Sequence, residues 1–391
     1  MRKKKVFVGL SGGVDSSVSA ALLKEAGYDV IGVFIKVWQP DWMKCTTTED
    51  RRDAMRVCAH IEIPFLEFNA EKIYKKSVVD YMVDEYGKGR TPNPDVMCNA
   101  YVKFGVFYEW AIQNGADFVA TGHYARIMEH GTRNMEQKKT GNLANQMLHV
   151  TSYTLHESSD SQKDQSYFLW QIKKEQLPHI MFPVGNMEKT EVRKLARKFG
   201  LPTAQKKDSQ GLCFIGKVDM KEFLGRYAKA KSGKVLNEKG EEIGIHDGAI
   251  FFTLGQRHGF KINTGKAQAK RTEDSSRMYV VSKNMKKNTI TVSSRTNAHK
   301  GEISNADRQE VFLSSVNWLS EKLPQEGETF KTRFRYREEL SDCVITAFNR
   351  KQKTLRLKLE ENGRYPTVGQ SAVIYSGRKL ELMGGGIIDM P

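Results

Sequence analysis

The sequence predicts an α/β protein whose N-terminal half is a doubly wound parallel sheet, followed by a small β-rich domain and a C-terminal β-barrel. Apolar and amphipathic segments alternate over residues 1 to about 125, and a glycine-rich turn follows the first apolar segment. From about residue 287, short alternating segments are separated by turn residues. The first pattern is typical of parallel sheets, which bind ligands at the C-terminal ends of their strands. The second is typical of β-barrels.

Apolar runs predict the strands of the parallel sheet at 6–10, 29–37, 64–68 and 117–121. Helices are expected between them, at about 14–26, 49–61, 70–86 and 100–114. Gly27 and Gly115 are suited to end two of these helices, because glycine readily adopts the left-handed conformation there. Later amphipathic segments predict helices at 165–176, 188–199 and 218–227.

The polar segment 129–161 interrupts this pattern and is predicted to be a surface insertion in the form of a hairpin. We therefore expect three domains, at 1–212, 213–286 and 287–391. In the last two, strands are expected at 233–235, 240–244, 249–253, 289–292, 330–336, 354–359 and 371–375.

The chain carries 62 Lys and Arg against 46 Asp and Glu, a net charge of +16 over 391 residues. Such an excess favours a polyanionic partner such as RNA, although a basic surface without a partner has the same composition. No apolar run approaches the roughly 20 residues that cross a bilayer. The basic N-terminus precedes a run too short for a signal peptide. We therefore expect a cytoplasmic protein with no membrane partner.

The segment Ser11–Ser17 carries the strongest local signal for function. It lies between an apolar strand and an amphipathic helix, so its backbone N–H groups and the helix N-terminus can bind anionic oxygens. Gly12 and Gly13 allow close approach of a phosphate. The Walker and G-x-G-x-x-G patterns do not fit, and an ordinary βα turn is the alternative. The segment is similar to the PP-loop of ATP pyrophosphatases, which implies cleavage of ATP between its α- and β-phosphates. Asp15 would then help to hold Mg²⁺ and the departing pyrophosphate.

The five cysteines argue against a disulfide scaffold and against a metal centre. Their number is odd, and no C-x-x-C spacing occurs among Cys45, Cys58, Cys98, Cys213 and Cys343. The patterns around Cys58 and Cys343 predict core positions, and Cys45 lies in a polar loop without an evident role.

Cys98 follows a loop that contains two prolines, and the next helix is expected to begin near Asn99. A helix N-terminus lowers the pKa of a thiol, so Cys98 is a candidate nucleophile. Asp95, three residues earlier, is placed to carry a proton. A capping aspartate beside a buried cysteine is an equally good interpretation of these residues alone.

Cys213 lies in Asp208–Gly216, at an expected junction between domains. Taken alone it is better explained as a half-buried structural cysteine. Together with Cys98 it suggests sulfur transfer, which needs one thiol to carry sulfur as a persulfide and another to release it. The two are 115 residues apart, so only tertiary structure can bring them together. Because of the junction position, we expect them to be apart until the polyanionic partner binds.

Nine segments distributed along the chain resemble the tRNA-specific 2-thiouridylases, which transfer sulfur to the wobble uridine of tRNA. They are Gly9–Ser16, Phe34–Trp38, Thr91–Asn99, Thr121–Arg126, Lys163–Leu169, Asp208–Ile215, Thr253–Gly259, Arg335–Arg337 and Gly369–Ala372. The cysteine-bearing segments are the most specific. The sequence departs from the family pattern at Ile35, where methionine is usual, and at Gln39–Asp41, where an acidic tract is common.

The resemblance implies a set of ATP contacts at Gly9, Leu10, Ser11, Gly12, Gly13, Val14, Asp15, Ser16, Ile35 and Gly122. It implies that Cys98 is the nucleophile, that Cys213 carries the persulfide, and that the two form a disulfide after transfer. The target base would meet Asn93, Pro94 and Asp95, with Asp95 as the acid/base. Further tRNA contacts are implied at His123, Lys163, Asp164, Gln165, Arg335, Tyr336 and Gln370.

The implied reaction adenylates the C2 oxygen of the uridine with Mg²⁺-ATP and then replaces that oxygen by sulfur. The sulfur would come from a sulfur-relay protein or a cysteine desulfurase. A small-molecule PP-loop ligase has no need of the two cysteines or the basic charge. A thiolase with an iron–sulfur cluster needs clustered cysteines, and an RNA-binding protein without activity has no need of an intact PP-loop.

Overall fold

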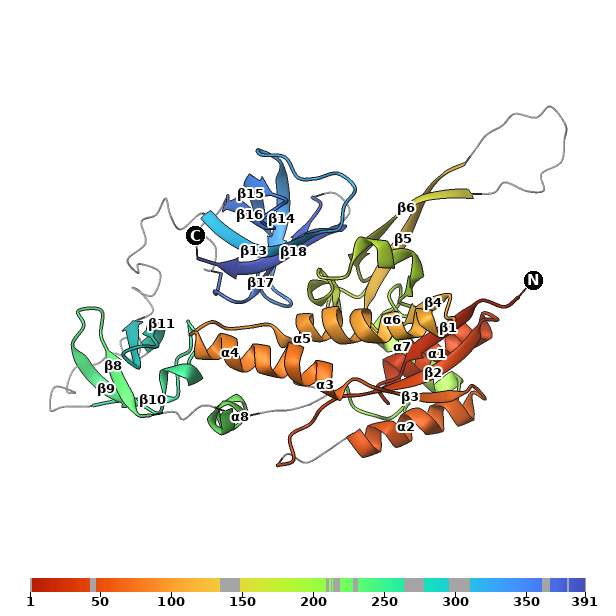
Figure 1. The fold of residues 1–391 in the computed structure, drawn as a ribbon, viewed down its shortest axis with the longest axis horizontal. Coiled ribbons are helices and arrows are strands. Elements are labelled where there is room, and N and C mark those ends of the chain that lie inside the picture. The colour runs from red at the N-terminus through yellow and green to blue at the C-terminus, as the bar shows by residue number, and fades with distance from the viewer. Residues whose placement is uncertain are drawn as a thin grey trace.

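The computed structural model describes residues 2–42, 47–133, 148–208, 211, 213, 219–227, 231–263, 278–294, 310–360, 366–377 and 380–390. Cys45 and the tip of the expected hairpin lie outside these ranges. An α/β unit, a small central sheet and a barrel follow one another along the chain (Figure 1). Among the described residues, no helix is long and apolar enough to span a bilayer.

The predicted parallel sheet is present and confirms the expected fold class. Its strand order is β3-β2-β1-β4-β7, and every neighbouring pair is parallel. The strands are β1 (Lys5–Gly9), β2 (Asp29–Lys36), β3 (Phe65–Asn69), β4 (Phe118–Ala120) and β7 (Ile180–Met181). β1 lies in the middle, where both of its faces are covered, so the run Val6–Val8 is almost fully buried. The loop after β1 therefore opens at the centre of the C-terminal edge.

Helices cover both faces of this sheet, as the alternating pattern predicts. They are α1 (Val14–Glu25), α2 (Thr47–His60), α3 (Glu71–Tyr74), η1 (Lys75–Asp80), α4 (Tyr81–Gly87), α5 (Pro94–Met97), η2 (Cys98–Phe107), α6 (Tyr108–Gln113) and α7 (Lys189–Lys198). The helix expected to begin near Asn99 begins instead at Pro94, where proline suits the first helical position. The Asn93 side chain caps it by accepting a hydrogen bond from the Val96 backbone N–H at 3.4 Å.

The helix expected at 165–176 is wrong. Only two short 3₁₀ turns form, η3 (Ser166–Phe168) and η4 (Lys174–His179). The apolar residues that produced the helical pattern are buried in different directions, because Trp170 donates a hydrogen bond to Ser371 of the barrel and Tyr167 bonds to the Phe334 carbonyl oxygen. The expected hairpin is present, formed by the antiparallel pair β5 (Ala125–Arg133) and β6 (Leu148–Glu157).

The central sheet has the order β10-β9-β8-β12-β11 and follows helix α8 (Met220–Tyr227). Its strands are β8 (Gly233–Leu236), β9 (Glu242–His246), β10 (Phe260–Ile262), β11 (Met278–Asn284) and β12 (Thr289–Ser294). Two expectations change here. The strand expected at 249–253 is a 3₁₀ turn, η5 (Ala249–Phe251). The boundary expected between residues 286 and 287 falls inside the β11–β12 hairpin, because β12 pairs with β8 and buries Ile290 and Val292 in this sheet.

The C-terminal strands close into a barrel in the order β13-β16-β15-β14-β17-β18. They are β13 (Glu310–Trp318), β14 (Thr329–Arg333), β15 (Ser341–Asn349), β16 (Thr354–Leu359), β17 (Ser371–Tyr375) and β18 (Leu382–Asp389). The barrel packs on the α/β unit beside the helices that follow β3 (Figure 1). Buried polar contacts join the two, including the ion pairs of Arg333 with Glu157 at 2.9 Å and with Asp164 at 3.3 Å.

Candidate active site

The loop after β1 has the geometry of an anion-binding turn. Gly12 lies in the left-handed region with φ of 70°, and a side chain there would meet the Asp50 carbonyl oxygen at 2.3 Å. The loop is held by its own serines, because Ser17 donates to the Gly13 carbonyl oxygen at 2.7 Å and the Ser11 N–H donates to the Ser16 hydroxyl at 3.2 Å. Helix α1 starts directly after it, with its first N–H groups at the sheet edge.

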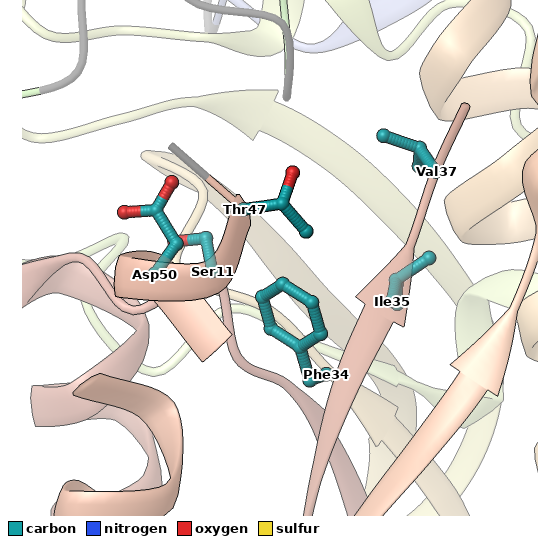
Figure 2. Close-up of a pocket in the computed structure, with 6 residues that line it drawn as sticks. All are labelled: Ser11, Phe34, Ile35, Val37, Thr47 and Asp50. Atoms are coloured by element: carbon teal, nitrogen blue, oxygen red, sulfur yellow. The ribbon is translucent and has the colours of Figure 1, made fainter. Parts of the chain in front are cut away.

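An open, shallow recess adjoins this loop (Figure 2). It is lined by Ser11, Phe34, Ile35, Val37, Thr47 and Asp50. Phe34 and Ile35 give it an apolar wall, which suits the face of a base. Gly122 closes in from β4, and a Cβ atom there would lie 2.5 Å from the Ser16 nitrogen. The structure therefore brings together the three segments that the sequence assigned to ATP.

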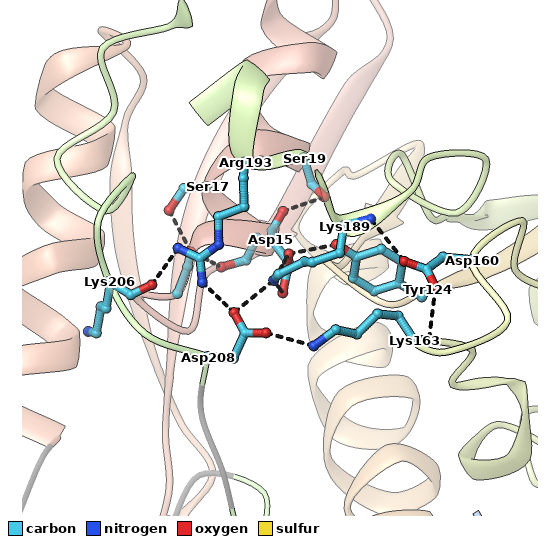
Figure 3. Close-up of polar contacts among 12 residues, drawn as sticks. Asp15, Ser17, Ser19, Tyr124, Asp160, Lys163, Lys189, Arg193, Lys206 and Asp208 are labelled. Carbon is cyan, nitrogen blue, oxygen red and sulfur yellow. Dashed lines mark hydrogen bonds and ion pairs between the residues drawn. The ribbon is translucent and has the colours of Figure 1, made fainter. Parts of the chain in front are cut away.

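Asp15 of this loop belongs to a cluster of charged residues (Figure 3). Its carboxylate accepts hydrogen bonds from Lys189 at 2.6 Å and from the Tyr124 hydroxyl at 2.9 Å. Nearby, the Asp208 carboxylate pairs with Lys163 at 2.7 Å, Lys189 at 3.0 Å and Arg193 at 2.5 Å. Partial burial alone raises the pKa of Asp208, but the hydrogen bonds from Lys163 and Lys189 outweigh it and hold the pKa well below its usual range. Lys163, expected to contact tRNA, thus lies beside the PP-loop.

The two cysteines singled out by the sequence lie together. The Cys98 and Cys213 sulfur atoms are 3.6 Å apart, and both are free thiols. Cys213 is held in place by its backbone, because its N–H donates to Asp95 at 3.0 Å and its carbonyl oxygen accepts from the Tyr74 hydroxyl at 2.7 Å. The expectation that the cysteines stay apart until tRNA binds stays a prediction, and this structure shows the arrangement in which their sulfur atoms are in contact.

The expectation that Cys98 has a lowered pKa is also wrong. Cys98 lies a full turn inside a helix that starts at Pro94, and it is completely buried, which raises the pKa of its thiol. The pKa of Cys213 is lowered instead, to about 7, because Cys98 donates a hydrogen bond to its sulfur and Lys103 supplies positive charge, against the effect of burial. The direct contact with Lys103 therefore favours a negative charge on Cys213.

Lys103 is the site residue that the sequence analysis missed. Its ammonium hydrogen-bonds to Cys213 and lies 3.3 Å from Nε2 of His123. In an α-helix a residue five positions after Cys98 would face a different direction. Residues Cys98–Phe107, however, form a π-helix, in which residues five apart are one hydrogen-bonded turn apart. The five-residue spacing between Cys98 and Lys103 therefore gave no signal in the sequence, because π-helices are rare. Where π-helical turns do occur, they often lie at functional sites.

Two residues expected to contact tRNA are internal in this structure. His123 is buried, which together with the Lys103 charge lowers its pKa well below the ordinary value. Asp164 is 3% exposed and accepts hydrogen bonds from Ser158 and Ser166 besides its pair with Arg333. These contacts use the polar atoms that direct binding of RNA would need.

Of the remaining residues expected to contact tRNA, some hydrogen-bond to the protein backbone and others have exposed side chains. Gln165 accepts a hydrogen bond from the Tyr124 N–H at 3.0 Å, and Gln370 donates to the carbonyl oxygens of Thr91 and Pro92. Arg335 is exposed and Tyr336 is half-buried, with its ring centroid 4.7 Å from that of Phe168. Arg335 also donates to the Thr367 hydroxyl at 3.2 Å, but its side chain and that of Tyr336 keep surface that a large partner can reach.

The residues described hold no group of three or more His, Cys, Asp or Glu side chains arranged for a metal ion. Asp15 is the carboxylate within the anion-binding loop, and Lys189 pairs with it at 2.6 Å. The donor set therefore suits a metal that arrives with a phosphate ligand better than one held by protein side chains alone.

Comparisons with known proteins agree with this architecture. A family profile described as the tRNA methyl transferase HUP domain matches residues 4–217. A PRC-barrel domain profile of the same group matches 221–294, and an aminomethyltransferase beta-barrel domain profile matches 308–388. Among solved structures, a 4-thiouridine synthetase in complex with RNA and ATP aligns with 57% of this chain and 50% of its own, at 17% identity and a TM-score of 0.31, too low to support an argument.

Curated relatives match the chain over nearly its full length. The protein from Staphylococcus saprophyticus is 41% identical over 98% of this chain and 95% of its own. The protein from Bacillus cereus strain ATCC 10987 is 42% identical over 98% and 94%, and the one from Pediococcus pentosaceus is 41% identical over 99% and 95%. All three are named tRNA-specific 2-thiouridylase MnmA. With this identity and coverage, the chain belongs to the tRNA-specific 2-thiouridylase family.

Proposed function

We propose that this protein catalyses the ATP-dependent 2-thiolation of the wobble uridine of tRNA, with release of AMP and pyrophosphate. The observation that carries the proposal is the pair Cys98 and Cys213, whose sulfur atoms lie 3.6 Å apart beside Asp95. Replacement of oxygen by sulfur from a persulfide consumes two thiols, and this pair supplies them in the domain that holds the PP-loop. The names of the relatives support the same activity.

In the first step the C2 oxygen of the uridine attacks the α-phosphorus of ATP, and pyrophosphate leaves. The N–H groups of the loop Ser11–Ser16 and the N-terminus of α1 would stabilise the charge on the phosphates. Ile35 and Gly122 would border the nucleotide. Mg²⁺ would enter with the triphosphate and neutralise part of its charge, and Asp15 is the loop carboxylate available to it. Adenylation converts the C2 oxygen into part of a good leaving group, AMP.

In the second step Cys213, loaded as a persulfide, delivers its terminal sulfur to C2, and AMP leaves. The uridine is then joined to Cys213 through a disulfide. The Cys98 thiol attacks the Cys213 sulfur and gives its proton to Asp95. A Cys98–Cys213 bond forms, and the electron pair of the broken S–S bond leaves with the sulfur on C2 as 2-thiouridine. Alternatively, Cys98 releases sulfide from the persulfide first, and that sulfide attacks C2. Both routes end in a disulfide that an external thiol must reduce.

The partners follow from the same chemistry. The net charge of +16 and the exposed Arg335 beside Tyr336 suit the anticodon stem-loop of a tRNA. The wobble base would leave its stack to reach the loop at Asn93 and Pro94. The persulfide would come from a sulfur-relay protein or a cysteine desulfurase. We propose that the protein acts in the cytoplasm, where unmodified tRNA is available.

The test incubates unmodified tRNA with the enzyme, Mg²⁺-ATP and a persulfide donor, and measures the mass of the wobble nucleoside. We expect ATP-dependent exchange of oxygen for sulfur, which Cys213→Ser abolishes. Cys98→Ser should leave the persulfide on Cys213 but stop turnover. Cys343→Ala, at a buried cysteine of the barrel, is the control and should retain activity. Consumption of ATP without sulfur in the RNA would overturn the proposal in favour of a PP-loop ligase.

A further inference from the structure

Lys103 places a positive charge between the thiol pair and the loop that follows β4. We propose that Lys103 is a catalytic residue that keeps the Cys213 sulfur, rather than the Cys98 sulfur, anionic and ready to accept sulfur from a persulfide. This inference rests on the proposed function in one respect, that Cys213 is the cysteine that carries the persulfide.

The contacts of the two sulfur atoms distinguish the two cysteines. The Lys103 ammonium hydrogen-bonds to Cys213, and the Cys98 thiol donates to the same sulfur over 3.6 Å. Lys103 contacts the Cys213 sulfur directly, whereas it acts on Cys98 only through its charge. Hydrogen bonds to the charged form of a group stabilise that form, so the negative charge settles on Cys213.

The groups that the structure describes around Cys213 come from α3, α5 and η2. Asp95 opposes a negative charge there and raises the pKa of Cys213, and the Tyr74 hydroxyl, fully buried, keeps its own proton because burial raises its pKa. Lys103 is the cation among the groups that shift the Cys213 pKa, beside the Cys98 hydrogen bond. Removal of its charge would leave Asp95 and burial to act on the thiol against that hydrogen bond alone.

Lys103 is itself held in a charged state. Burial lowers its pKa, but the negative charge on Cys213, its hydrogen bond to Lys103 and the charge of Asp95 act against burial, and the pKa is raised. His123 supports the same state, because burial and the nearby ammonium keep the ring neutral. Its Nε2 then accepts from Lys103 at 3.3 Å, which assigns the ring proton to Nδ1, where it is donated to the Thr121 hydroxyl at 2.7 Å. Thr121 is followed by Gly122, which adjoins the recess beside the PP-loop. A chain of hydrogen bonds through His123 and Thr121 therefore connects Lys103 to the loop at this recess.

The step that Lys103 would assist is transfer of sulfur from a donor persulfide, R–S–SH. The Cys213 thiolate attacks the terminal sulfur, a Cys213–S–SH bond forms, and the donor S–S bond breaks. The electron pair leaves with the donor sulfur as R–S⁻, so charge and electrons balance without another reactant. A thiol that is anionic near neutral pH reacts fast, because the thiolate is the nucleophile.

The test measures alkylation of Cys213 by iodoacetamide against pH in the whole protein, resolved by peptide mass. The wild-type rate should be half-maximal at about pH 7. We expect Lys103→Met to slow the reaction at neutral pH by about tenfold or more and to move the midpoint upward, while Lys103→Arg retains most of the rate. Asp95→Asn should move the midpoint the other way. Lys76→Met, at an exposed lysine of η1, is the control for net charge. Superimposable profiles for the wild type and Lys103→Met would overturn the inference.

Persulfide loading gives a second readout that does not need RNA. With a small persulfide as donor, the mass of the Cys213 peptide should show slower sulfur uptake in Lys103→Met than in the wild type. Thermal unfolding and ATP binding of the variant should match the wild type, which shows that it folds. If the wild type loads sulfur but never thiolates tRNA, the proposed function fails and Lys103 keeps its role. If Lys103→Met loads as fast as the wild type, the inference fails and the proposed function stands.

Discussion

The Gln370 side chain of the barrel donates a hydrogen bond of 2.9 Å to the carbonyl oxygen of Thr91. It donates a second hydrogen bond, of 3.0 Å, to the carbonyl oxygen of Pro92. The Thr91 N–H in turn donates to the carbonyl oxygen of Val368 at 2.9 Å. Arg90, one residue earlier, pairs with Asp389 at 2.6 Å. The barrel therefore holds the start of the loop that leads to Asp95 and Cys98, so it positions the thiol pair from outside the α/β unit.

Gln370→Ala removes two of these hydrogen bonds from the loop. Each contributes about 1 kcal/mol, so we expect kcat for thiolation to fall by roughly tenfold while the Kd for tRNA stays within about twofold. Gln352→Ala, in an exposed turn of the same barrel, is the control and should change neither. Weakened tRNA binding with unchanged kcat would instead assign Gln370 to direct contact with the RNA.

Lys189→Met removes the cation that neutralises Asp15 beside the PP-loop. The remaining carboxylate repels the triphosphate, and a charged hydrogen-bond donor is lost, so we expect the Kd for ATP to rise by about tenfold or more. Calorimetric titration with ATP measures this. Lys194→Met lies on the same helix with its side chain exposed and should bind ATP as the wild type does. Equal affinities for the two variants would exclude a role of Lys189 in binding the phosphates.

Gly122→Ala tests the close approach of the loop after β4 to helix α1. The added Cβ atom would lie 2.5 Å from the Ser16 nitrogen and 2.7 Å from the Asp15 carbonyl carbon, both backbone atoms that cannot rotate away. We expect a loss of about 1–3 kcal/mol in the free energy of unfolding and weaker ATP binding. Gly87→Ala, where no atom lies within 4 Å, should change neither property. Urea denaturation and ATP titration measure the two effects.

Arg333→Met removes the cation that pairs with the carboxylates of Glu157 and Asp164 between the barrel and the hairpin. Since both carboxyl groups are largely buried, we expect a loss of about 3–5 kcal/mol in the free energy of unfolding. Lys331 lies on the same strand as Arg333 and forms a more exposed ion pair with Asp342 of β15. Lys331→Met should lower the free energy of unfolding by less than about 1 kcal/mol.

The loss in Arg333→Met should depend on pH. Burial already raises the pKa of Glu157 and of Asp164, and Arg333 opposes that rise. Without Arg333 both folded-state pKa values rise further. A group with a raised folded-state pKa contributes stability at low pH that is lost as the pH rises through that value. The destabilisation measured by urea denaturation should therefore be smallest at acidic pH and grow as the pH rises toward neutrality through the folded-state pKa values. A loss that is constant over this range would contradict the explanation.

The sequence by itself determined the order of strands and helices in the α/β unit, because the apolar period of each element is a local property. The strands predicted at 6–10 and 29–37 are observed at Lys5–Gly9 and Asp29–Lys36. The glycine turn at Gly12 could be recognised for the same reason, since left-handed backbone restricts the residue type. The β-barrel, too, follows from short alternating strands. Around Trp170 the apolar residues are buried in several directions, so their helical spacing led to the wrong prediction of a helix at 165–176.

Tertiary structure alone decided which residues share the thiol pocket. Cys213 reaches Cys98 because Asp95 and Tyr74 bind its backbone, contacts between segments more than a hundred residues apart that no local pattern encodes. Lys103 joins them because residues Cys98–Phe107 wind as a π-helix, which turns the fifth residue toward the sulfur atoms. Burial raises the pKa of Cys98, whereas the hydrogen bond from Cys98 and the charge of Lys103 lower that of Cys213 against the effect of burial. The sequence specifies the reactive groups, and the packing around them determines which group carries the charge.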